Sequence, residues 1–104
     1  MTSPTPRTLA ELRKRGYLAE VTERWVPGAN IRRDLFGFGD VLGLREAEVL
    51  MVQATSGDNV SKRVTKIAEH PNVDAVRKAG IRIAVWGGRR NAAGRWTLRE
   101  VDCS

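Results

Sequence analysis

The chain has 104 residues, which suits one small domain with a single core, expected at residues 8–104 after a loose segment at residues 1–7. Hydrophobic residues make up 41% and charged residues 29%, a globular composition, and no apolar run is long enough to span a bilayer, which excludes a membrane-spanning protein. Lysine and arginine outnumber aspartate and glutamate by 18 to 12, and the resulting charge of +6 favours a polyanionic partner, although a generic basic surface has the same composition.

The basic residues are spread along the chain in pairs such as Arg32-Arg33 and Lys62-Arg63, which predicts a folded basic surface and not a disordered basic tail. The first residues lack the apolar core of a secretory signal. The single cysteine, Cys103, cannot form an internal disulfide, in agreement with a reducing compartment. We therefore expect a cytoplasmic protein, located in the host cytoplasm if a phage encodes it.

The first elements in chain order are a helix and a strand. Thr8 and Glu11 fit the capping box of a short helix that ends at Gly16. Residues 17–26 contain β-branched and aromatic residues in imperfect alternation and predict a strand. A proline-glycine turn follows, and residues 27–34 are expected to form a basic loop.

Two apolar runs come next, at residues 36–44 and 49–55, separated by the charged residues 45–48. This pattern predicts an antiparallel hairpin, and its near-continuous hydrophobicity indicates strands that are covered on both faces. The following segment, residues 59–70, has apolar residues at helical spacing and predicts a helix that ends before Pro71, with Asp58 or Asn59 as its cap.

The last elements are a short helix at residues 72–80, a strand at 81–86, a polar turn at 87–94 and a final strand at 95–101. The order is therefore helix, strand, strand, strand, helix, short helix, strand, strand. This order predicts an α/β fold in which a mixed β-sheet is flanked by helices.

An acid and an amide are expected to meet in the hairpin. Side chains two residues apart in a strand share a face, so Gln53 and Thr55 should point the same way. A turn at residues 45–48 would bring Asp40, in the preceding strand, close to Gln53. Simpler interpretations remain open, in which Asp40 caps a turn beside Gly39 and Asp34 is a loop residue.

This arrangement resembles the restriction-endonuclease-like PD-(D/E)XK nuclease superfamily, especially small Holliday-junction resolvases of the archaeal type and VRR-NUC-like phage and bacterial nucleases. The matching residues are Gly39-Asp40, in place of the PD element, and Gln53-Ala54-Thr55, in place of acid-x-Lys. The resemblance covers roughly residues 8–87 and implies a restriction-endonuclease-like core.

The resemblance implies a metal-dependent nuclease. In that superfamily, the residues at the positions of Asp40 and Gln53 bind Mg²⁺ or Mn²⁺, and a lysine at the position of Thr55 assists the attacking water. The hard cation Mg²⁺ prefers oxygen ligands and is often shared with a substrate phosphate. Here Gln53 offers only a neutral amide oxygen, and Thr55 has neither the charge nor the reach of lysine. The motif therefore departs from the superfamily at two of three positions.

Residues outside the motif are candidates to complete this site. Some members of the superfamily carry the lysine on the following helix, where Arg63 flanks the apolar stripe while Lys62 and Lys66 lie nearly opposite it. We expect Arg63 to be the catalytic candidate, with a plain surface helix as the alternative. Asp34 and Glu23 are the spare carboxylates for the metal, although Glu23 also fits an exposed strand residue.

The leading hypothesis is a metal-dependent DNA endonuclease or a phosphodiester hydrolase of the Holliday-junction-resolvase kind. Its partner would be duplex or branched DNA, bound by Arg32, Arg33, Lys62, Arg63 and Lys66; whether it is a homodimer is left open. Two alternatives remain: a catalytically inactive DNA-binding module with the nuclease fold, and a small phage structural or adaptor protein.

Overall fold

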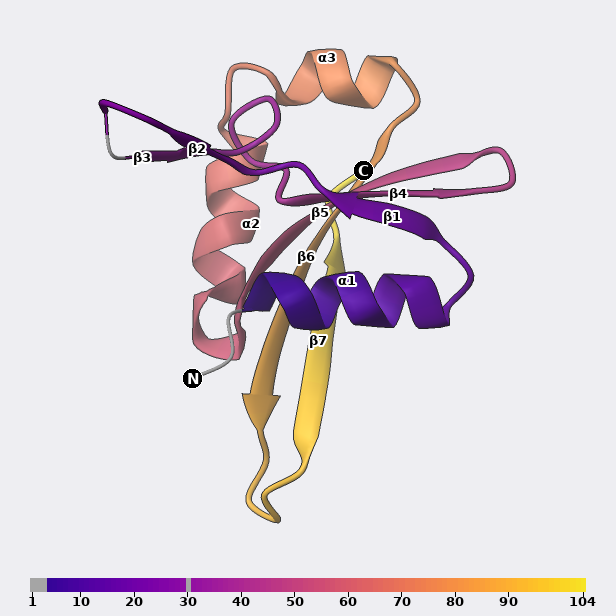
Figure 1. Cartoon of the computed structure of the whole chain (residues 1–104), viewed down its shortest axis with the longest axis vertical. Helices are drawn as coiled ribbons and strands as arrows, with labels where there is room; N and C mark the ends of the chain where they lie inside the picture. Colours follow the sequence, from indigo (N-terminus) through magenta and orange to yellow (C-terminus); the bar gives the residue numbers. More distant parts are fainter. Residues whose placement is uncertain (1–3, 30) are drawn as a thin grey trace.

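The computed structural model describes residues 4–29 and 31–104, without the side chain of Arg32. Within this part of the chain, five strands form a mixed sheet in the order β1-β4-β5-β6-β7 (Figure 1). Only β5 and β6 pair in parallel; the other neighbours are antiparallel. The bounds of these strands are β1 Leu18–Val21, β4 Val41–Arg45, β5 Glu48–Ser56, β6 Arg82–Arg90 and β7 Trp96–Asp102. The expected α/β fold with a mixed sheet and flanking helices is confirmed.

Helices cover both faces of the sheet. On one face lies α1 (Pro4–Lys14), and the other is covered by α2 (Val60–Ala68) and α3 (Val73–Lys78), with a 3-10 turn η1 (Gly57–Asn59) leading into α2. No helix in the described ranges is long and apolar enough to cross a membrane.

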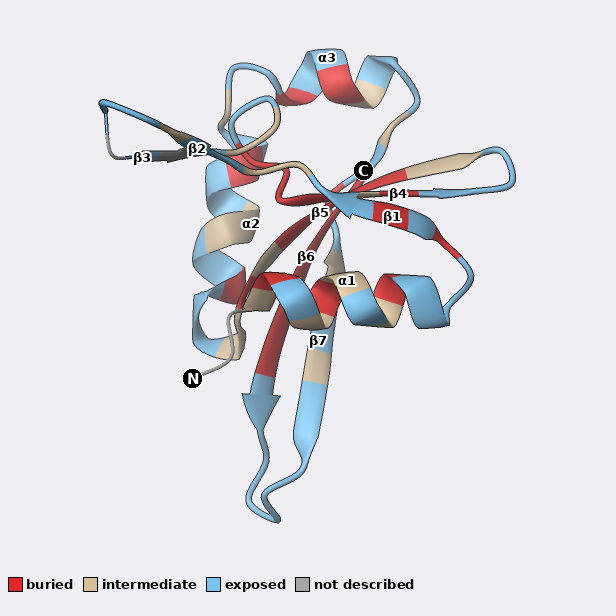
Figure 2. Cartoon of the chain, viewed as in Figure 1, coloured by how far each residue is buried: buried red, intermediate tan, exposed pale blue. Residues whose placement is uncertain are grey.

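The side chains of the central strands β5 and β6 point alternately into two hydrophobic cores, because successive side chains of a strand point to opposite faces of the sheet. Met51 and Ile83 belong to the core under α2 and α3, whereas Val52 and Ala84 belong to the core under α1. These strands are buried along most of their length (Figure 2). This double coverage was expected from the hydrophobicity of the 49–55 segment.

The expected strand at residues 17–26 is broken at Thr22-Glu23. The β1–β4 ladder ends at the Val21–Val41 pair, and Thr22 then donates from its backbone N–H to the carbonyl oxygen of Asp40 at 2.8 Å. The chain leaves the sheet there and forms a separate hairpin of β2 (Arg24–Val26) and β3 (Ile31–Arg33), so the expected basic loop at 27–34 is partly a strand.

The expected strand at residues 36–44 begins only at Val41. Ahead of it, Leu35 and Gly39 pair around a tight turn in which Phe36 and Gly37 have positive φ angles of 56° and 94°. Only the apolar side chain of Phe38 is buried in this turn, at 1% exposure. A hydrophobic turn was therefore taken for a strand from its composition.

Helix α1 begins at Pro4, so residues 4–7 are helical and the expectation of a loose segment there is wrong. Proline is well tolerated in the first turn of a helix because its missing N–H has no intrahelical partner there. Thr8 consequently lies inside the helix and is buried, and Glu11 binds Arg15 at 2.9 Å instead of closing a capping box.

The hairpin turn of β4 and β5 lies at residues 46–47, within the expected 45–48. The C-terminal hairpin is longer than expected: β6 continues through Gly87 and Gly88 to Arg90 and pairs with β7 up to Trp96. This hairpin extends well beyond the ends of the other strands (Figure 1).

Candidate metal site

A pocket of about 440 Å³ lies where β4 begins and β5 ends, beside the first turns of α1 and α2. Six of the side chains that line it were predicted as site residues from the sequence, and they come from five different segments of the chain. Its lining residues are Pro4, Thr5, Glu23, Asp34, Asp40, Gln53, Ala54, Thr55, Ser56, Asn59 and Arg63.

Asp40 is fixed by the sheet on both its backbone and its side chain. Its N–H donates at 3.0 Å to the carbonyl oxygen of Val52, the residue that pairs with Val41, so the backbone is tied to β5 just ahead of β4. Its Oδ2 accepts a hydrogen bond from the N–H of Ala54 at 2.9 Å. Asp40 as a whole residue is only 5% exposed. The two hydrogen bonds hold its carboxyl group against the part of β5 that carries Gln53 and Thr55.

Three carboxyl groups converge in the pocket. Glu23, Asp34 and Asp40 each present an oxygen within 4.8 Å of the other two. Burial, a hydrogen bond with Asp34 and repulsion by the charges of Asp34 and Glu23 raise the pKa of Asp40 from 3.8 to about 8, against the opposing effect of the Ala54 N–H. Like charges this close are strongly unfavourable unless a proton or a cation is shared among them.

Gln53 and Thr55 lie beside these acids, as the period of two predicts. Both are buried, at 2% and 5% exposure. The Oε1 atom of Gln53 is buried without a hydrogen-bond partner among the described residues. A buried acceptor that lacks a partner costs free energy, so this amide oxygen is suited to a ligand that enters the pocket.

The donor set fits a hard divalent cation. Three carboxylates and a buried amide oxygen offer oxygen ligands only, which is the preference of Mg²⁺ and Mn²⁺. Glu23 and Asp34, which the sequence offered as spare acids, supply the charge that Gln53 lacks. Thr55 supplies a hydroxyl group where the resembled superfamily has an ammonium group.

The basic candidates divide into two groups. Arg63 is half-buried and lines the pocket, whereas Lys62 and Lys66 are exposed on the outer side of α2. Lys66 and Arg33 line a second depression with Asp34. Arg32 is part of β3 by its backbone, but its side chain lies outside the described part of the structure.

Sequence reasoning missed several residues near the site. Ser56 lines it from the end of β5 and Asn59 from the N-cap of α2, and apolar periodicity does not single out either residue. Arg7 was placed in the loose segment and belongs instead to α1. The extended C-terminal hairpin carries four exposed arginines that were not predicted as DNA-binding residues, although Arg89-Arg90 was counted in the expected basic surface; they are Arg89, Arg90, Arg95 and Arg99. The pair Arg89-Arg90 was the available signal.

No protein-family model matches the chain, and no curated protein shows significant similarity to it.

Proposed function

We propose that this protein is a metal-dependent phosphodiesterase that acts on DNA. The observation that carries the proposal is the meeting of three carboxyl groups within 4.8 Å of one another beside the buried, unpartnered Oε1 of Gln53. Such a set of oxygen donors would bind one divalent cation through Asp40, Asp34, Glu23 and Gln53.

The order of elements supports a restriction-endonuclease-like core. Helix α1 is followed by three antiparallel neighbours, β1, β4 and β5, and then by α2. This is the order of helix, strand, strand, hairpin partner and helix on which the resemblance rests, with Asp40 one residue ahead of β4 and not within it. The β2–β3 hairpin is an insertion between the first two strands, and it places Glu23 and Asp34 at its two ends.

A bound Mg²⁺ or Mn²⁺ would polarise the scissile phosphate and lower the pKa of an attacking water. The protein side chains have separate tasks around that centre. Asp40 stays oriented because the Ala54 N–H holds one oxygen and leaves the other for the ion. Arg63, on the pocket wall, can hold a phosphate oxygen through its planar guanidinium group. Thr55 contributes a hydroxyl group for a hydrogen bond to phosphate or water.

The charge distribution supports a nucleic-acid partner. The β6–β7 hairpin carries four exposed arginines between Gly87 and Arg99 and no acidic residue in that stretch. Lys62 and Arg63 add positive charge at the start of α2, next to the pocket. Neutralisation of several phosphates by such residues releases counterions and gives binding that depends strongly on salt.

The experiment that tests the proposal is a cleavage assay on linear duplex, branched and single-stranded DNA across titrations of Mg²⁺ and Mn²⁺. We expect cleavage that is lost on chelation and in Asp40→Asn. Asp74→Asn, which removes an exposed acid on α3, is the matched control and should cleave as the wild type does. Absence of cleavage in every condition would remove the enzyme assignment.

A second candidate is a DNA-binding module that retains the fold without catalysis. The observation that favours it is the pair of neutral side chains, Gln53 and Thr55, at the positions of an acid and a lysine. This protein would bind DNA with the same salt dependence and would cut none of the substrates. The combined substitution of Gln53→Glu and Thr55→Lys then tests whether the missing groups restore cleavage.

A further inference from the structure

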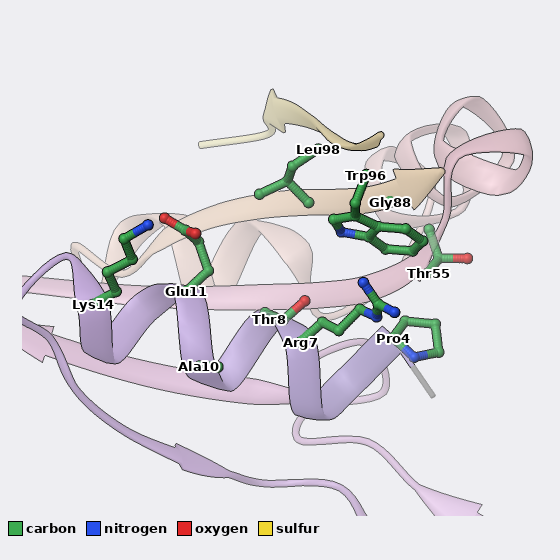
Figure 3. A pocket seen from close by; sticks show the side chains of 10 residues that line it. All are labelled: Pro4, Arg7, Thr8, Ala10, Glu11, Lys14, Thr55, Gly88, Trp96 and Leu98. Atoms are coloured by element: carbon green, nitrogen blue, oxygen red, sulfur yellow. The ribbon is translucent and has the colours of Figure 1, made fainter. Parts of the chain in front are cut away.

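Another pocket, different from the depression lined by Arg33 and Lys66, adjoins the candidate metal site. It has a volume of about 260 Å³ and lies between α1 and the β6–β7 hairpin (Figure 3). Pro4 and Thr55 line both pockets, so the two are neighbours at the first turn of α1. The lining residues are Pro4, Arg7, Thr8, Ala10, Glu11, Lys14, Thr55, Gly88, Trp96 and Leu98.

Arg7 lies against Trp96 in this pocket. Its guanidinium carbon lies 3.8 Å from the centre of the Trp96 ring, a cation–π contact that holds the group in place. The other side of the indole rests on Gly88, where a Cβ atom would come within 2.0 Å of the ring. Trp96 is therefore packed between Arg7 and Gly88, although 43% of the residue stays exposed, and it supports Arg7 at the edge of the pocket.

The guanidinium group retains hydrogen-bonding capacity. The Nε atom of Arg7 is buried and has no hydrogen-bond partner among the described residues. The acid nearest along α1, Glu11, is engaged by Arg15 at 2.9 Å, and Arg15 also binds Glu100 at 2.7 Å. Lys14 lies two turns further along the same wall. The charged residues that line the pocket give it a net positive charge, and no carboxylate in the described part of the chain forms an ion pair with Arg7.

We propose that Arg7 binds a backbone phosphate of the DNA strand next to the phosphate held at the metal site. This inference rests on the proposed function, because it takes DNA to be the partner. The unsatisfied planar donor matches the fork geometry with which arginine binds phosphate oxygens. The shared wall at Pro4 and Thr55 makes the subsite an extension of the metal pocket, so a strand that lies in one would continue into the other.

The test measures binding of a fluorescein-labelled duplex of about twenty base pairs in EDTA, so that cleavage plays no part. Arg7→Gln should weaken binding about fivefold to tenfold and lower the log–log salt slope by about one. Lys78→Gln is the matched control, since it removes one exposed charge from α3, on the opposite side of the sheet from α1, and should change affinity less than about twofold. Arg7→Lys should recover the salt slope and only part of the affinity, because lysine keeps the charge without the planar fork.

Equal losses in Arg7→Gln and Lys78→Gln would overturn the subsite and leave the metal site standing. The same conclusion would follow if Arg7→Gln lowered the melting temperature but left affinity and salt slope unchanged, since Arg7 would then only fasten α1 to the hairpin. If the wild-type protein bound no DNA at all, both the subsite and the proposed partner would be wrong. Metal-dependent cleavage by the wild type, lost in Asp40→Asn, separates failure of the subsite from failure of the proposed function.

Discussion

The Oδ2 atom of Asp40 accepts a hydrogen bond from the backbone N–H of Ala54, the residue between Gln53 and Thr55. This bond joins the start of β4 to the end of β5 and aims the carboxyl group into the pocket. Asparagine can still accept it through its amide oxygen, whereas alanine leaves the N–H unsatisfied. The two substitutions therefore separate the charge of Asp40 from its role in the fold.

We expect Asp40→Asn to abolish metal binding and cleavage and to leave DNA binding unchanged or stronger, because a negative charge facing phosphates is removed. Asp40→Ala should also be inactive, and it should be less stable than Asp40→Asn by about 1–3 kcal/mol. Calorimetric metal titration and urea denaturation measure the two effects. Equal stability of the two variants would show that the bond to Ala54 contributes little.

The raised pKa of Asp40 predicts how stability depends on pH without metal. The folded protein keeps this proton up to about pH 8, whereas the unfolded chain releases it near pH 3.8, so the folded state binds more protons between these values. The contribution of Asp40 to the free energy of unfolding is therefore fully present below the lower value and is lost as pH rises toward the upper one. Denaturation in EDTA at several pH values should show this decline, and Asp40→Asn should flatten it. An identical pH dependence in both proteins contradicts the assignment.

Gln53 is expected to act as a metal ligand through its unpartnered Oε1. Gln53→Glu should tighten metal binding, and without metal it should lower stability because it adds a fourth carboxylate to three. Gln53→Met should weaken metal binding, while its stability without metal stays equal or rises, since an unsatisfied buried acceptor is lost. Metal titrations of both variants test this. Unchanged affinity in Gln53→Met would place the amide outside the coordination sphere.

Arg63 and Lys62 are adjacent in sequence but differ in position, since only Arg63 lines the pocket. We expect Arg63→Gln to lower kcat by about tenfold or more through loss of a phosphate contact at the reacting group. Lys62→Gln should leave kcat unchanged and weaken DNA binding only slightly. Steady-state cleavage assays separate the two parameters, and equal effects of both substitutions on kcat would remove Arg63 from the site.

Periodicity predicted the parts of the site that regular strands carry. Gln53 and Thr55 share a face because they are two residues apart in β5, and the β4–β5 turn brings Asp40 beside them. The helix after η1 was also predicted correctly, because Val60 and Ile67 occupy its buried face.

The parts that depend on side-chain bonds across the chain could not be predicted from local pattern. The strand break at Thr22 results from hydrogen bonds to Gly39 and Asp40, which lie far away in sequence. The turn before Asp40 is hydrophobic and therefore has the composition of a strand. The convergence of Glu23 and Asp34 follows from these two irregular segments, so sequence analysis could name both acids but could not fix their positions.

The three carboxylates belong to segments that are brought together only by the complete β1–β4–β5 arrangement and the inserted hairpin. An unfolded chain cannot present them as one site, so a cation that binds there binds the native state alone. At a concentration about a hundred times its dissociation constant, such an ion adds about 2.7 kcal/mol to the free energy of unfolding. The melting temperature should then rise by about 10 °C or more when the cognate ion is added to the wild type, and the ion should leave that of Asp40→Asn unchanged. The rise in melting temperature with each ion therefore shows which cation the site binds, even while the substrate is unknown.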